Sequence, residues 1–184
     1  MRAPTPSFLA ALLLGTMALG MSPASSQESG VGPVTKLPLP RYASLKTDRV
    51  NLREGPSKDH RTLWVFQRAG LPVEIVGEFE TWRRIRDSEG TEGWVLHSLL
   101  SGRRTAIVNA GPDKNGVKPT VSLRASADDT AADEARLQTG VIGSVKKCTG
   151  QWCRMIVTLP SKRDVDGYIR QNRLWGVYPN EVVE

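Results

Sequence analysis

One segment of the chain occurs twice, and this duplication constrains the fold more than any other feature. Residues 70–82 align without a gap on residues 140–152, with glycine at the start and tryptophan at the end of both. The match extends outward to Leu-Arg at 52–53 and 123–124, and to Gly-aromatic-aliphatic at 93–95 and 167–169. Such a repeat predicts two copies of one small unit rather than a single large core.

The N-terminal segment, residues 1–26, predicts a signal peptide. The segment has a basic residue, Arg2, near its start, continues with an apolar run over residues 8–21 and reaches Ala24-Ser25-Ser26, whose small side chains suit a signal peptidase. We therefore expect cleavage after Ser26 and export of the mature protein. The apolar run is shorter than the roughly 20 residues that cross a bilayer and is interrupted by glycines, so no stable membrane insertion is expected.

The net charge of +6 is moderate and agrees with more than one role. A positive surface would suit anionic partners in the cell envelope, such as phosphate-bearing lipid head groups or wall polymers. The basic residues are interspersed with acids, however, as in residues 83–89, which is typical of a solvated, solubilising surface. Nucleic acid is not an expected partner of an exported chain.

The chain has two cysteines, Cys148 and Cys153. In an exported protein this closely spaced pair predicts a disulfide across a tight hairpin, which adds about 2 kcal/mol at most because the closed loop is short. The alternatives are a zinc site and a catalytic thiol. A zinc site would need His60 and His97, whose spacing matches no common zinc motif, so neither a metal nor another cofactor is expected.

The apolar stretches are short and are separated by Gly, Pro, Asp and Asn clusters, which predicts an all-β fold. In the first copy we expect strands at 72–76, 81–87 and 93–96, a 3₁₀ turn at 97–100 and a last strand at 104–108. In the second copy, residues 128–137 are rich in Ala and Glu and could form a helical turn, but a loop equivalent to residues 57–63 of the first copy is the more economical interpretation.

The composition also predicts where the units begin and end. Residues 27–40 are rich in Gly, Pro and Ser and predict a flexible lead-in. Residues 109–116 consist almost wholly of turn formers and predict a linker. This linker separates a first unit, residues 41–108, from a second unit, residues 117–184.

The order of these elements resembles that of the bacterial SH3-like domains. The closest resemblance is to small exported bacterial proteins with two such domains in tandem, in which the second copy has a Cys-x-x-x-Trp-Cys hairpin and ends in Leu-Trp-Gly-Val-Tyr. Here these motifs are residues 148–153 and 174–178. The resemblance implies two tandem SH3-like small β-barrels, a periplasmic location or release from the cell, and binding of cell-wall peptides or glycans.

Two tryptophans of the repeats are candidate ligand contacts. Trp82 and Ile85 are three residues apart on a strand and therefore point to opposite faces, as do Trp152 and Met155. If Ile85 fills the first barrel, Trp82 stands outside it beside Arg84 and could form a shelf for a sugar ring or an extended peptide. Alternatively, each tryptophan lies flat over a neighbouring turn or in the contact between the units.

The first copy has a further candidate, Trp64, in the long loop near the SH3 groove. The second copy has no aromatic residue at that place, so we expect a ligand groove on the first copy. Arg53 would shape the rim of this groove, or would instead form a structural ion pair at the base of the loop.

The C-terminal motif has no apolar counterpart in the first copy after Leu100. We expect its apolar side chains to bury the seam between the repeats, although a docking tail is the alternative. The residues concerned are Leu174, Trp175, Val177 and Tyr178.

The sequence contains no arrangement of residues typical of a catalytic site, so no enzymatic activity is expected. It favours a monomeric, exported binding module that recognises a cell-wall peptide or glycan. The alternative is a protein-interaction adaptor that docks an envelope enzyme or transporter. A small wall hydrolase would need its cysteine thiol free and close to a histidine.

Overall fold

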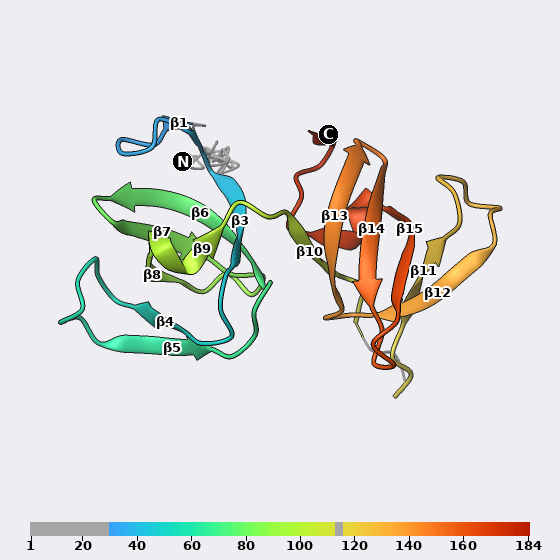
Figure 1. Ribbon diagram of the computed structural model, residues 1–184, viewed down its shortest axis with the longest axis horizontal. Helices are drawn as coiled ribbons and strands as arrows, with labels where there is room; N and C mark the ends of the chain where they lie inside the picture. Colours follow the sequence, from blue (N-terminus) through green and yellow to red (C-terminus); the bar gives the residue numbers. More distant parts are fainter. Residues whose placement is uncertain (1–29, 113–115) are drawn as a thin grey trace, which may run out of the picture.

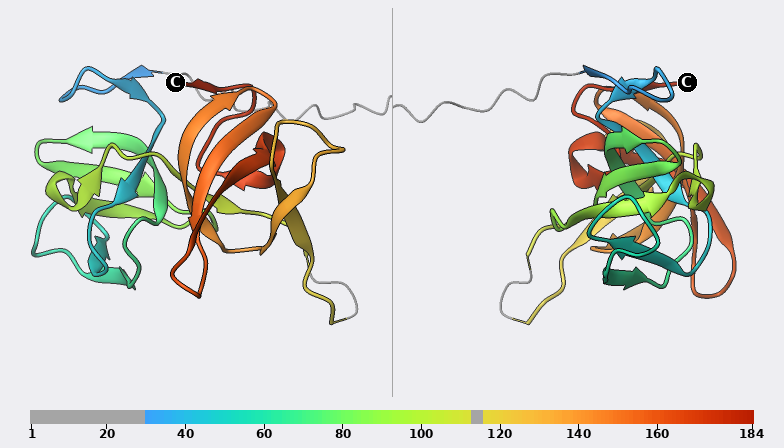
Figure 2. Two further views of the ribbon diagram at one scale, coloured as in Figure 1. Left: turned by 45° about the vertical axis from the view of Figure 1, so that its right-hand side comes forward. Right: turned by 90° about the vertical axis from the view of Figure 1, so that its left-hand side faces the viewer.

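The computed structural model describes residues 30–112 and 116–184, so the predicted signal peptide lies outside the described residues. The fold is all-β, as predicted, and forms two tandem units that each curl around their own core (Figure 1). In the first sheet the strand order is β5-β4-β8-β7-β6-β3-β9, and in the second it is β12-β11-β15-β14-β13-β10-β16, with β17 added to β13. Both views in Figure 2 place β1 and the C-terminus on the same side of the molecule.

The first unit contains nine strands and one short 3₁₀ helix. They are β1 (Gly30–Val31), β2 (Pro38–Leu39), β3 (Arg41–Leu45), β4 (Val50–Arg53), β5 (Thr62–Phe66), β6 (Pro72–Phe79), β7 (Trp82–Arg86), β8 (Glu92–Leu96), η1 (His97–Leu99) and β9 (Leu100–Ser101). The second unit repeats this order from β3 onward and adds a last short strand. Its elements are β10 (Thr105–Val108), β11 (Thr120–Arg124), β12 (Asp133–Gln138), β13 (Ile142–Thr149), β14 (Trp152–Thr158), β15 (Asp164–Arg170), η2 (Gln171–Arg173), β16 (Leu174–Trp175) and β17 (Val182–Val183).

Each unit has its own hydrophobic core, built from the inward side chains of its strands. Ile85 and Met155 are completely buried at equivalent places in these two cores. The condition set for an outward Trp82, that Ile85 fills the first barrel, is therefore met. Because side chains alternate between the two faces of a strand, the burial of Ile85 also means that Trp82 lies on the opposite face of β7.

The strand predicted at 104–108 forms, but it belongs to the second unit. This strand, β10, pairs with β13 and β16, and it lies beside β13 in Figure 1. Ala106 and Val108 alternate into the second core, where both are fully buried. The prediction that this strand closes the first unit is wrong, because its alternation fits either core equally well. The chain crosses between the sheets over residues 102–104, and residues 109–116, predicted as the linker, lie between β10 and β11.

The lead-in predicted to be flexible is folded over its described part, residues 30–40. Strands β1 and β2 form a small hairpin, and the backbone N–H groups of Val34 and Thr35 donate hydrogen bonds to the carboxylate of Glu78 at 3.0 and 2.8 Å. The Thr35 hydroxyl donates a third, at 2.5 Å. The prediction failed because this segment is held by polar contacts to a distant strand, whereas its sequence offers few apolar residues for a core.

The region expected as a loop at 128–137 is part strand. Strand β12 pairs along β11, with Ala135 opposite Leu123 and Leu137 opposite Val121. Leu137 is only 2% exposed and packs into the second core, whereas the charged residues between these positions face outward. With Leu137 as its one large inward-facing apolar residue, this segment shows too little alternation of apolar and polar residues to be recognised from the sequence as an edge strand.

Cys148 and Cys153 form the predicted disulfide. They are opposite each other on the hairpin of β13 and β14, with their Cα atoms 4.1 Å apart. Both cysteines of the chain are therefore paired, which leaves no free thiol for the alternative of a catalytic cysteine. Across residues 30–112 and 116–184, none of the helices is long and apolar enough to span a membrane.

Candidate functional site

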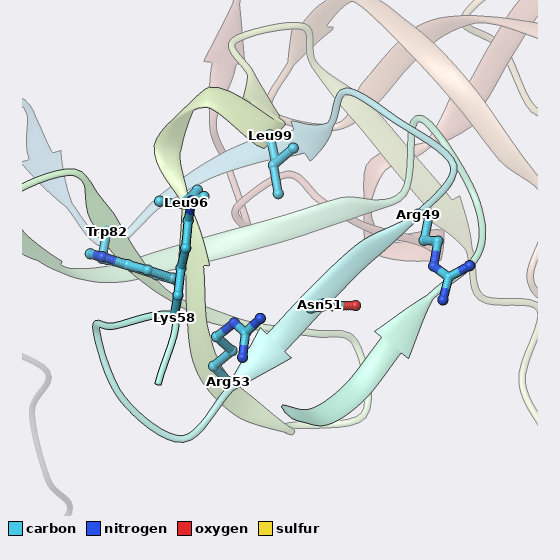
Figure 3. Close-up of a pocket in the computed structure, with 7 residues that line it drawn as sticks. All are labelled: Arg49, Asn51, Arg53, Lys58, Trp82, Leu96 and Leu99. Atoms are coloured by element: carbon cyan, nitrogen blue, oxygen red, sulfur yellow. The ribbon is translucent and has the colours of Figure 1, made fainter. Parts of the chain in front are cut away.

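A groove of about 280 Å³ lies on the first unit, between β4, the start of β7, the end of β8 and η1 (Figure 3). It combines three basic side chains, one amide, one aromatic ring and two leucines. These lining residues are Arg49, Asn51, Arg53, Lys58, Trp82, Leu96 and Leu99. Its size matches a sugar ring or a few residues of a peptide rather than a large cofactor.

Strand β4 forms one wall of the groove, because its side chains alternate between the core and the outer face. Val50 and Leu52 point into the first core and are fully buried, so Asn51 and Arg53 must point to the other face, where they line the groove. Arg53 is held in place because its Nη1 donates a hydrogen bond to the carbonyl oxygen of His60 at 2.8 Å. This contact to the main chain, rather than the ion pair considered for Arg53, ties the strand to the loop that carries Lys58.

Trp82 contributes to the base of the groove. It lies opposite Leu96 in the register of β7 and β8, and Figure 3 shows Lys58 and Leu96 beside its ring. As predicted from its spacing to Ile85, Trp82 is not part of the core cluster. It is nevertheless only 7% exposed, so of the alternatives considered for Trp82 the open aromatic shelf is not formed. The neighbouring side chains cover most of the ring and leave it as an apolar base under the basic residues.

The groove is cationic. Its lining residues include Arg49, Arg53 and Lys58, and no carboxylate is found among the described residues that line it. The nearby Glu54 is bound instead by Arg61, whose Nη2 lies 2.6 Å from its Oε1. Positive charges gathered in a small hollow of this kind attract anionic groups of a ligand.

Trp64 does not contribute to this groove. Its register partner on β4 is Leu52, so it lies on the inner face of the β4–β5 hairpin, whereas Arg53 lies on the outer face. Its side chain is 61% exposed and lines a separate hollow of about 320 Å³ beside the turn between β7 and β8. A single groove containing Trp64, Arg53 and Trp82, as expected from the sequence, is therefore not formed.

Arg84 also lies apart from the groove. Its register partner on β8 is Trp94, and its Nη2 contacts Oε2 of Glu92 at 2.7 Å. With 53% of its side chain exposed, Arg84 belongs to a solvated ion pair on the outer face of the sheet. Of the four candidates taken from the sequence, the structure brings only Arg53 and Trp82 together.

The C-terminal motif divides between the second core and the first unit. Leu174 and Val177 pack into the second core. The rings of Trp175 and Tyr178 instead contact the Tyr42 ring, with centroid separations of 5.2 and 4.6 Å. The hydroxyl of Tyr178 donates a hydrogen bond to Oε1 of Glu74 at 2.9 Å, and burial together with this carboxylate raises the pKa of Tyr178 well above its usual value.

Sequence reasoning missed several groove residues. Arg49 and Asn51 had a usable signal, because polar residues alternate with Val50 and Leu52 along residues 49–53. Lys58 lies in an irregular loop, Leu96 precedes η1 and Leu99 ends it, so no periodicity relates them to the other groove residues.

The sequence and the structure of the chain resemble those of known proteins. A family model described as a bacterial SH3 domain matches residues 46–102 and again residues 117–176. Solved structures similar to the chain include NlpC2 and NlpC1 from Trichomonas vaginalis and an NlpC/P60 family protein from Bacillus cereus, at 12%, 13% and 12% identity and TM-scores of 0.32, 0.32 and 0.31. The matches cover 74%, 73% and 73% of this chain and 48%, 45% and 55% of those structures, so the chain spans about half their length. A comparison with curated protein sequences finds no match.

Proposed function

The chain belongs to the bacterial SH3 domain family, and from this premise we propose that it is a non-enzymatic, periplasmic binding module that recognises a cell-wall peptide or glycan. Bacterial SH3 domains are binding domains that occur often in proteins of the cell envelope. Export through the signal peptide predicted at residues 1–26 would bring this chain to the same compartment.

The observation that supports this function best is the groove above Trp82. It joins an apolar base to three basic side chains within about 280 Å³. Wall polymers combine sugar rings, whose faces pack on aromatic and apolar surfaces, with peptides that carry negative charge. A groove with both properties is suited to a fragment of such a polymer.

Co-sedimentation with purified peptidoglycan tests the proposal. We expect the wild-type protein to pellet with the polymer and the double variant Arg49→Glu, Lys58→Glu to remain in solution, because both changes reverse exposed charges in the groove. Lys147→Glu is the matched control, since it reverses an exposed charge on β13 of the second unit. Wild-type protein that stays in the supernatant would rule the proposal out.

A separate observation favours the second candidate function, an adaptor that docks an envelope enzyme or transporter. Leu63 and Trp64 are 40% and 61% exposed and lie side by side along β5, where an apolar protein partner could cover them. Crosslinking in intact cells with wild type and Trp64→Ala tests this candidate. A partner recovered repeatedly with wild type and lost with Trp64→Ala would support it, and the absence of any repeatable partner would count against it.

A further inference from the structure

The second unit contains a groove equivalent to the one above Trp82. The registers establish the equivalence, because Trp82 is opposite Leu96 as Trp152 is opposite Arg170. Arg124, which is opposite Tyr168 on β15, likewise takes the place of Arg53, which is opposite Trp94 on β8. The second groove has a similar size, about 230 Å³.

The second groove holds a carboxylate of its own. The guanidinium of Arg170 lies over the ring of Trp152, with Cζ 4.2 Å from the ring centroid. This guanidinium binds Asp129 through both Nε and Nη2, with Nε 3.2 Å from Oδ1. The hydrogen bond from Arg170, with a further contribution from Arg124, lowers the pKa of Asp129, so this carboxylate is ionised in the groove.

The first groove lacks both members of this pair. Leu96 replaces Arg170 in the register, and Lys58 replaces Asp129 five residues after the groove arginine of its unit. What remains is a set of three basic side chains above a tryptophan, with no acid among the described lining residues. Both grooves have three basic side chains, but only the second, lined by Arg124, Arg170 and Arg173, also contains an acid.

We propose that the first groove binds a free carboxylate of its ligand, in the place that Asp129 occupies within the second groove. This inference rests on the proposed function and specifies its ligand as a short wall peptide with free carboxylates rather than a neutral glycan. A carboxylate gains charge-assisted hydrogen bonds from arginine and lysine, which a sugar hydroxyl does not provide to the same extent. Among the three arginines of the second groove, Asp129 already takes the place of the ligand carboxylate on Arg170, so we expect this groove not to bind the ligand.

The test compares two forms of one probe, the tripeptide L-Ala-γ-D-Glu-L-Lys with its carboxylates free and the same peptide with them amidated. Calorimetry with the full exported chain gives the affinity. The indole N–H signals of Trp82 and Trp152 in NMR spectra show which groove responds. We expect the free peptide to shift the Trp82 signal alone and amidation to weaken binding about tenfold or more.

Exchange variants separate this mechanism from a general charge effect. The double variant Lys58→Asp, Leu96→Arg transfers the internal pair into the first groove and should abolish the Trp82 response. The reciprocal variant Asp129→Lys, Arg170→Leu should create a response at Trp152. Lys147→Asp, on the surface of the second unit, should leave both affinities unchanged.

Two results would overturn the inference and are distinguishable from failure of the proposed function. Equal affinity for both peptides, or a wild-type response at Trp152, would contradict the carboxylate site even if the protein still sediments with peptidoglycan. If the chain neither sediments with peptidoglycan nor binds either peptide, the inference and the proposed function both fail.

Discussion

The two units close the same hairpin by different chemistry. In the second unit Cys148 and Cys153 are opposite each other on β13 and β14 and form the disulfide. The gap-free repeat places Glu78 and Arg83 at these two positions in the first unit, where they are opposite each other on β6 and β7. Their charged groups lie 3.6 Å apart, with side chains 0% and 7% exposed. A buried ion pair thus occupies the place of a covalent bond.

The ionic version of this cross-link needs more of the chain than the covalent version. A buried carboxylate is costly unless several donors satisfy it. Glu78 receives hydrogen bonds from residues 34 and 35, and Nη2 of Arg41 approaches it at 2.8 Å. Burial raises the pKa of Glu78, but the donors at Thr35, Arg41 and Val34 outweigh this effect and lower it to about 2. The comparison explains why the N-terminal segment is folded onto the first unit.

The largest expected effect comes from removing the carboxylate. Glu78→Ala leaves the buried Arg83 with only the carbonyl oxygens of Glu80 and Trp82 as acceptors, and should lower the free energy of unfolding of the first unit by about 3 to 5 kcal/mol. Residues 30–40 should also become sensitive to protease, since their anchor is lost. Urea unfolding and limited proteolysis measure the two effects. Asp166→Asn, which removes the exposed contact to Arg154 at 2.6 Å, is the control and should cost less than about 1 kcal/mol.

The second largest effect is expected in acid, which should unfold the first unit before the second. The folded-state pKa of Glu78, about 2, is below its ordinary value of 4.5, so Glu78 stabilises the first unit above pH 4.5 and this contribution is lost as the pH falls toward 2. The loss is on the order of 3 kcal/mol for a shift of this size. NMR signals assigned to each unit, recorded from pH 6 to pH 2, should show the first unit unfolding before the second. Equal acid sensitivity of the units, or an unchanged profile in Glu78→Gln, would contradict this.

Breaking the covalent cross-link should have a smaller effect. The double variant Cys148→Ala, Cys153→Ala should destabilise the second unit by about 2 kcal/mol, because the disulfide closes only a short loop. The first unit should keep its stability in the same urea titration. A loss larger than that of Glu78→Ala would reverse the order of importance proposed for the two cross-links.

The smallest effect is expected at the seam between the units. Tyr178→Phe removes the hydrogen bond to Glu74 and should cost about 1 kcal/mol. Its stacking on Tyr42 remains, so the units should stay in contact but unfold less cooperatively in acid. Differential scanning calorimetry at pH 4 would show this as a broader transition than in wild type, and an unchanged transition width would indicate that the hydrogen bond does not couple the units.

The sequence was most informative where the repeats share landmarks. Glycine, tryptophan and the aliphatic residue after it recur at fixed spacing, which predicted the meander, the disulfide hairpin and the tandem fold. The same alignment places Glu78 against Cys148, although a charge pair does not resemble a disulfide in sequence. Of the groove, Arg53 and Trp82 were found from the repeat.

The remaining features depend on contacts between distant residues. Strand β10 fits either core by its pattern, and only its pairing with β13 assigns it to the second. Residues 30–40 contain little apolar surface, and hydrogen bonds to Glu78 hold them in place. In the second unit, the groove contains a contact between Asp129 and Arg170, which are 41 positions apart in the sequence.

The assignment of β10 to the second sheet has a practical consequence for dissecting the protein. The family match to the second unit begins at residue 117, so a fragment cut there would lack β10. The edges of β13 and β16 would then carry backbone N–H and C=O groups without their β10 partners. Open edges of this kind recruit strands from other molecules, so such a fragment would tend to self-associate or aggregate. A second unit meant to be soluble in isolation should therefore begin before Thr105.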